Sequence, residues 1–155
     1  MFSFSTSKKP ELDSEIADLR EQQRTAFRQS KPFRGWLADV WRDPARPDLR
    51  SRAAALGIDG NEYGEILTSV AMAKVRADDA AAWPAVSKAM QTLQADLTKA
   101  WERHRAATSD AARDAVAKEI AALTFQRSDS RLRWAACRTA HEQREGLRAA
   151  GLLVE

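Results

Sequence analysis

The sequence contains one cysteine, Cys137, among its 155 residues. A single thiol cannot close a disulfide within the chain, and it excludes a cysteine-based metal site. No apolar run approaches the roughly 20 residues that a membrane-spanning helix needs. Residues 1–10 also lack the charged and then apolar order of a signal peptide. We therefore expect a cytoplasmic protein with no membrane association.

Glycine and proline are scarce, with six and five residues, and most of them precede residue 85. Runs of alternating β-branched residues, which are typical of half-buried strands, are absent. The second half is rich in Ala, Leu, Arg, Glu and Gln, which favour helices. The sequence predicts an all-α fold, a compact helical bundle of about six helices. Residues 1–9 are expected to form a flexible N-terminal arm, and residues 10–155 a single helical domain.

Motifs that support catalysis are absent as well. The sequence has no glycine-rich phosphate loop, no nucleophile elbow and no paired-carboxylate motif. Its two histidines, His104 and His141, lack the spacing of metal ligands. We predict a protein that is not an enzyme and that holds no cofactor and no metal. Cys137 is expected to be a buried, unreactive thiol.

The longest amphipathic pattern lies between Trp83 and Arg105. Its apolar residues recur every three or four positions: Val86, Met90, Leu93, Leu97, Trp101 and His104. This spacing places them on one helix face, which other helices must cover. Pro84 is expected in the first turn, where its missing N–H costs nothing. Similar patterns predict further helices over residues 10–30, 33–41, 48–56, 62–77, 110–124 and 128–150.

The expected helix over residues 10–30 combines a heptad-like stripe with segregated charges. The stripe consists of Leu12, Ile16, Leu19, Gln23 and Ala26. The acidic residues come first: Glu11, Asp13, Glu15 and Asp18. The basic residues follow: Arg20, Arg24, Arg28 and Lys31. This order matches the helix dipole, and it also offers a basic end to an anion, so Arg20, Arg24 and Arg28 are secondary candidates for nucleic-acid contacts.

An arginine-rich face is expected on the last helix. At 100° per residue, one side carries Arg127, Arg131, Trp134, Arg138, His141 and Arg148. Guanidinium groups bind phosphate through two parallel hydrogen bonds, and an exposed indole can stack on a base. The primary candidates for nucleic-acid contacts are therefore Arg127, Arg131, Trp134, Arg138 and Arg148. The alternative is a solvated face that Glu142 and Glu145 partly neutralise.

Residues 49–75 resemble a helix-turn-helix, the DNA-reading motif. Gly57 marks the turn, with Ala53 four residues before it and Ile58 directly after it. The resemblance implies that the second helix lies in the major groove with its first residues on base edges. Those residues include Glu62 and Glu65, whose carboxylates would be repelled by phosphate. An ordinary helix hairpin is the alternative.

Phe33, Trp36 and Trp41 form a dense aromatic face on the short helix over residues 33–41. Such a face packs into a core, or it lies in the groove of a partner protein. We retain it as the candidate partner-binding site.

Three functions fit these observations. The first is a non-enzymatic helical subunit of a larger assembly that contacts nucleic-acid backbone, of RNA or DNA, without reading bases. The net charge of +3 is modest, so this depends on how the arginines are grouped. The second is a protein–protein adaptor or scaffold that contacts other subunits or self-associates. The third is a helix-turn-helix DNA-binding regulator that uses residues 49–75.

Overall fold

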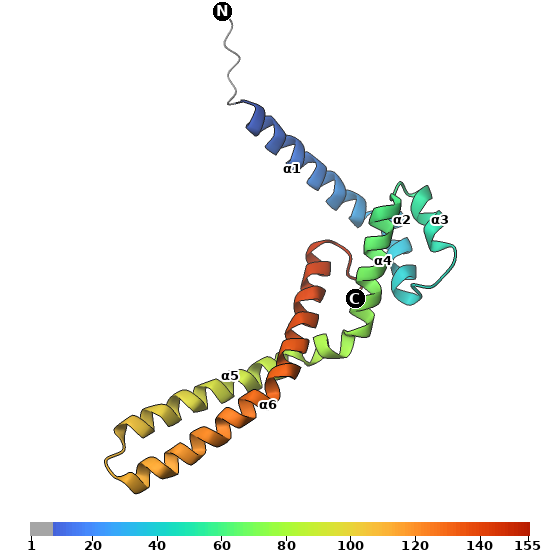
Figure 1. Ribbon diagram of the computed structural model, residues 1–155. Helices are drawn as coiled ribbons and strands as arrows, with labels where there is room; N and C mark the ends of the chain where they lie inside the picture. The colour runs from blue at the N-terminus through green and yellow to red at the C-terminus, as the bar shows by residue number, and fades with distance from the viewer. Residues whose placement is uncertain (1–7) are drawn as a thin grey trace, which may run out of the picture. The chain divides into compact units, whose positions relative to one another are not determined.

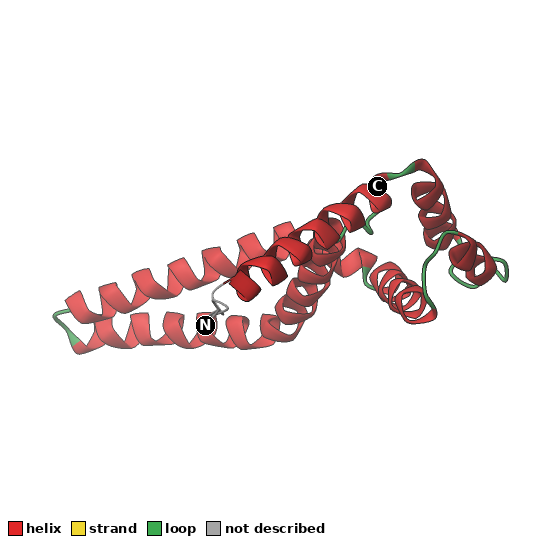
Figure 2. Cartoon of the chain, turned by 90° about the horizontal axis from the view of Figure 1, so that it is seen from above, coloured by secondary structure: helices red, strands yellow, loops and turns green. Residues whose placement is uncertain are grey.

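The protein is described by a computed structural model that covers residues 8–155. Every regular element in this range is an α-helix, as Figure 2 shows. The helices are α1 (Lys8–Gln29), α2 (Lys31–Arg42), α3 (Leu49–Ala55), α4 (Gly60–Val75), α5 (Ala77–Ala106) and α6 (Asp110–Ala149). The predicted all-α class with about six helices is confirmed. Residues 1–7 of the predicted arm lie outside the described range, and residues 8 and 9 already belong to α1.

The described chain forms two compact units. Their segments can be followed in Figure 1 by the colours, which run along the chain by residue number. The first unit contains residues up to 74 together with residues 146–155, and the second contains residues 75–145. The second unit is therefore inserted between two segments of the first. The prediction of a single helical domain over residues 10–155 stays a prediction.

The core of the first unit is built around α2. Phe33, Trp36, Leu37 and Val40 recur at helical spacing, and all four are buried. The indole N–H of Trp36 donates a hydrogen bond to the Leu49 carbonyl oxygen at 3.0 Å, so its polar atom is satisfied in the core. The other buried members are Leu49, Ala53, Ile58, Ile66, Val70, Leu147 and Leu152.

Two glycines end helices in the first unit, as the sequence predicts. Gly57 follows α3 with φ 84°, and Gly151 follows α6 with φ 72°. After each glycine the next amide bonds back to the helix: Ile58 N–H to Ala53 O at 3.0 Å, and Leu152 N–H to Leu147 O at 2.9 Å. Both ends are Schellman motifs, in which the residue after the glycine also packs into the core.

The second unit is a hairpin of α5 and α6, which run side by side in Figures 1 and 2. Leu97 and Ala100 of α5 pack against Ile120 of α6, and Ala100 is fully buried. Arg103 and Glu119 join the two helices by a 2.7 Å ion pair. Its hydrogen bond holds the pKa of Glu119 below the ordinary value.

Two predicted helix boundaries are wrong. Pro84 lies inside α5, which begins at Ala77, and not in its first turn. Acidic Asp78 and Asp79 favour the earlier start because they oppose the positive end of the helix dipole. The helices predicted over residues 110–124 and 128–150 form one helix, α6. The serines at 128 and 130 do not interrupt it, because serine disfavours a helix interior only weakly.

Within the described residues, no helix is both long enough and apolar enough to span a membrane.

Candidate nucleic-acid interface

Arg127 and Arg131 lie one turn apart on the exposed surface of α6. Within residues 8–155, neither guanidinium forms an ion pair. Carboxylates pair with most of the other arginines that the sequence singled out. Arg127 and Arg131 therefore keep their charge and donors available for a ligand.

The two arginines line a groove between α5 and α6. It consists of two adjoining hollows of about 400 and 480 Å³ that share Gln94 and Arg127. We name it the tryptophan–arginine groove. Its walls are Met90, Gln94, Leu97, Thr98 and Trp101 of α5, and Thr124, Arg127, Ser128, Arg131 and Trp134 of α6.

Trp134 is held in a fixed position in this groove. Its ring lies 5.9 Å from the ring of Trp83, which in turn stacks on His141 at 5.7 Å. The guanidinium carbon of Arg138 lies 5.3 Å from the Trp134 ring centre, within cation–π range. The half-buried indole is therefore preorganised, with part of its surface left open to the groove.

Trp101 lines the same groove from α5, and the sequence assigned it no functional role. Its position on the apolar stripe predicted burial, yet 47% of its surface is exposed. Its ring meets His104 edge-on at 5.7 Å. The one available signal was its place near the C-terminal end of the stripe, where a hairpin has fewer neighbours to cover a large side chain.

The residues that line the groove include no carboxylate. Two guanidinium groups, two indoles, three hydroxyl groups and one amide therefore face a shared space whose lining carries no carboxylate. Guanidinium groups bind phosphate in a bidentate manner, and indoles stack on bases. This composition suits an anionic ligand with planar groups.

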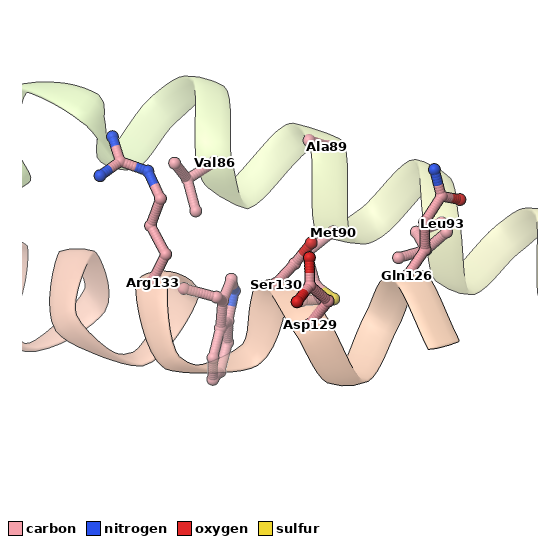
Figure 3. A pocket seen from close by; sticks show the side chains of 9 residues that line it. Val86, Ala89, Met90, Leu93, Gln126, Asp129, Ser130 and Arg133 are labelled. Atoms are coloured by element: carbon pink, nitrogen blue, oxygen red, sulfur yellow. The ribbon is translucent and has the colours of Figure 1, made fainter. Parts of the chain in front are cut away.

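A neighbouring pocket between α5 and α6 differs in charge. It measures about 400 Å³ and shares Met90 and Trp134 with the groove. Figure 3 shows Arg133 reaching from α6 toward α5 near Val86, and Asp129 belongs to the same pocket. The Asp129 carboxylate would repel a phosphate, so we place the candidate interface in the groove.

Three other candidate arginines are already paired within the chain. Arg138 contacts Glu142 at 2.9 Å on the same helix. Arg148 contacts Glu155 at 2.5 Å, and Arg24 contacts Glu21 at 3.4 Å. These pairs are exposed and weak, so they reduce the positive charge of the surface without preventing a ligand from competing. Arg20 is exposed and forms no ion pair with a described residue.

Arg28 requires a correction. Its side chain is 14% exposed, and it donates to the Ala150 carbonyl oxygen at 2.6 Å and to Glu62 at 3.2 Å. Arg34, which the sequence did not single out, donates to the carbonyl oxygens of Gly151 and Leu153, each at 2.9 Å. Both guanidinium groups bind carbonyl oxygens of the segment that follows α6, near the negative end of the helix dipole. Arg28 is structural in this arrangement.

The candidate partner-binding face also requires a correction. Phe33 is 0% and Trp36 is 1% exposed, so neither side chain offers surface to a partner. Trp41 is half-buried, and its indole N–H donates to the Leu152 carbonyl oxygen at 2.9 Å. Phe33 and Trp36 therefore belong to the core of the first unit, and Trp41 joins α2 to the C-terminal segment.

The segment that resembles a helix-turn-helix forms α3, a four-residue turn and α4. Asp59 accepts a hydrogen bond from the Glu62 amide at 2.8 Å and so caps α4. A shallow hollow on the first turns of α4 is lined by Asn61 and Glu65 among others. The exposed start of α4 thus carries carboxylates and no arginine or lysine.

The described residues contain no group of three or more side chains suited to a metal ion. Cys137 is fully buried, as expected, and His141 stacks on Trp83. His104 lies half-buried in the last turn of α5.

No family model matches the chain, and no curated protein or solved structure matches it either. The chemistry of the groove therefore carries the functional interpretation.

Proposed function

We propose that the protein is a non-enzymatic helical subunit that contacts the backbone of a single-stranded nucleic acid through the tryptophan–arginine groove. One observation carries the proposal. Arg127 and Arg131, which have no ion-pair partner in residues 8–155, lie between two indoles in a groove without carboxylates.

The proposed contacts follow from the chemistry of these side chains. Arg127 and Arg131 bind consecutive phosphates, since guanidinium groups form strong bidentate hydrogen bonds with phosphate. Trp101 and Trp134 accept bases by stacking, which every base permits and which therefore selects no sequence. Gln94 and Ser128 supply further polar contacts. A duplex stacks its bases internally, so the indoles favour a single strand.

The test is a binding titration with a fluorescently labelled single-stranded oligonucleotide of mixed sequence. The double variant Arg127→Ala/Arg131→Ala should lower affinity at least about tenfold, because it removes two phosphate contacts. The slope of log affinity against log salt should fall by about 1.4, since each phosphate contact to a single strand contributes about 0.7.

The matched control is Arg113→Ala/Lys118→Ala. These two cations are also exposed in the second unit, lie in the first three turns of α6, and do not line the groove. The control removes the same net charge and should change affinity by less than about threefold. Equal losses in the two double variants would show that only net charge matters and would reject the groove.

A second function has separate support. Large apolar side chains lie exposed on several helices, among them Leu12, Ile16 and Leu19 on α1, and Phe125 and Leu132 on α6. Exposed apolar stripes are typical of contacts between protein subunits. A protein–protein role is therefore an alternative that can also coexist with nucleic-acid binding. The helix-turn-helix alternative has less support because the exposed start of α4 is acidic.

A further inference from the structure

Helix α1 carries an apolar stripe that no other described residue covers. Leu12, Ile16 and Leu19 are 55%, 46% and 57% exposed, and every described side chain from residue 9 to 26 is exposed. With Gln23 and Ala26, these residues alternate steps of four and three, the seam of a coiled coil. A helix this amphipathic gains stability when another element covers its stripe.

The C-terminal end of α1 is firmly attached to the first unit. The ring of Phe27 lies 5.2 Å from that of Phe33, and Arg28 bonds to Glu62 and to the Ala150 carbonyl. The preceding 18 residues extend from this base for about five turns. Figure 1 shows this part of α1 standing clear of α2, α3 and α4.

The charges along α1 indicate what covers the stripe. Its first half carries Glu11, Asp13, Glu15 and Asp18 against Lys8 and Lys9, and its second half carries Arg20, Arg24 and Arg28 against Glu21, so the first half is net acidic and the second net basic. A second copy in the antiparallel direction would place each acidic half beside a basic half. A parallel copy would place the two acidic halves side by side and the two basic halves side by side. The net charges of the halves therefore favour the antiparallel orientation, in which a two-fold axis relates the two copies.

We propose that the protein forms a homodimer in which α1 pairs with α1 of a second copy in an antiparallel coiled coil. The seam then packs Ile16 against Leu19 of the second copy, and Leu12 against Gln23 of the second copy. Beside the seam, Asp13 faces Arg20 of the second copy, and the symmetry repeats that pair. The proposal is independent of the nucleic-acid groove, which lies on α5 and α6.

The dimer is expected to dissociate on dilution, because each helix contributes only three large apolar residues. Sedimentation equilibrium on the full chain over about 5–500 µM should show a monomer–dimer equilibrium. Asp13→Lys or Arg20→Asp alone should shift it toward monomer, since each places like charges together at both symmetric positions. A monomer at the highest concentration of the unmodified chain would overturn the proposal.

Mixing the two charge variants tests the orientation. In an antiparallel pair, the Asp13→Lys copy and the Arg20→Asp copy complement each other at both flanking positions. The mixture should therefore recover dimer that neither variant forms alone. Loss of dimer in each variant without recovery on mixing would reject the antiparallel arrangement.

Two apolar variants complete the experiment. Leu12→Ser/Ile16→Ser/Leu19→Ser should abolish the dimer, whereas Leu132→Ser, at an 85% exposed position on α6, should leave it unchanged. Circular dichroism then shows whether helix is lost. A dimer that survives the triple variant would place the interface elsewhere and overturn the proposal, whatever the helix content.

Discussion

At the scale of single residues, the charges that surround a side chain set its pKa and its contribution to stability. Asp39 on α2 contacts Arg52 at 2.8 Å, Arg42 at 3.4 Å and Arg46 at 3.5 Å. The hydrogen bond from Arg52, with the charges of the three arginines, holds the pKa of Asp39 below its ordinary value. This carboxylate links α2 to α3 and to the loop between them.

The lowered pKa of Asp39 sets the sign of a pH effect. A carboxyl group whose folded pKa is depressed stabilises the fold above its unfolded pKa, near 4, and loses that contribution as pH falls through the folded value. We therefore expect Asp39→Asn to lower the unfolding temperature at pH 7. The difference from the unmodified protein should shrink progressively below about pH 4. Thermal unfolding followed by circular dichroism across that range measures it.

Glu65→Gln is the control for this pH effect. Glu65 is an exposed carboxylate of the same unit that lies on α4. Its replacement should change the unfolding temperature little at any pH. If Asp39→Asn lowers the temperature by a constant amount at pH 7 and at pH 3, the ion pairs are not the cause.

The eight candidate residues for nucleic-acid contact differ in the groups that surround their side chains. Arg28 and Arg127 both follow the helical period, and neither is distinguished by its neighbours in the sequence. The structure gives Arg28 a carbonyl acceptor 122 residues away. It gives Arg127 an open groove. Long-range partners of this kind are not encoded in local spacing.

At the scale of elements, glycines at helix ends and in helix interiors should respond oppositely to alanine. Gly57 ends α3 at φ 84°, a conformation that L-residues adopt with strain. Gly64 lies inside α4, and no atom lies within 4 Å of an added methyl group. We expect Gly57→Ala to destabilise the fold by about 1–2 kcal/mol. Gly64→Ala should stabilise it by about 0.5–1 kcal/mol.

Urea unfolding of the two glycine variants provides the measurement. Both substitutions add the same methyl group, and neither site has a steric obstacle, so each serves as the other's control. A destabilised Gly64→Ala would contradict the expected gain in helix propensity. Equal effects of the two variants would contradict the backbone explanation.

Helix α6 continues without a break through a segment whose sequence predicted a helix start. Ser128, Asp129 and Ser130 resemble a helix start, yet they lie in the interior of a 40-residue helix. They border the pockets between α5 and α6, where short polar side chains leave space. The sequence signal that predicted a break therefore marks the place where the hairpin opens into the groove.

At the scale of the whole chain, the N-terminal and C-terminal parts of the described sequence pack together in the first unit. The C-terminal segment supplies buried Leu147 and Leu152 to a core otherwise made from residues before 75. It also accepts hydrogen bonds from Arg28, Arg34 and Trp41. The core of the first unit is therefore incomplete without residues 146–155.

Deletion of residues 150–155 tests this dependence. The loss of Leu152 alone should cost about 2–5 kcal/mol, as truncation of buried leucine does, and three arginine or indole donors lose their acceptors as well. Hydrogen exchange should then show reduced protection in α2 and α4, with α5 less affected. Deletion of Glu155 alone is the control, and it should leave the exchange pattern nearly unchanged. Equal loss of protection in α5 would mean that the two units unfold together.

The sequence by itself determined the helical class and several helix ends. Apolar residues at steps of three and four define α2 and α4, and Gly57 and Gly151 end helices. Helical spacing and glycine termination can be predicted from the sequence because both depend on residues only a few positions apart. The start of α5 and the continuity of α6 were mispredicted. Proline and serine only disfavour a helix locally, and packing between α5 and α6 outweighs that preference.

The sequence predicted the residues of the candidate site only in part. Arg127, Arg131 and Trp134 were placed on one face from their spacing alone. Tertiary structure decided that Trp101 faces the same groove, that Arg28 caps the end of α6, and that Phe33 and Trp36 are buried. The physical reason is that a charged or aromatic side chain follows the same helical period whether it meets solvent, a carboxylate or a distant carbonyl. Which of these it meets depends on contacts between segments far apart in the chain.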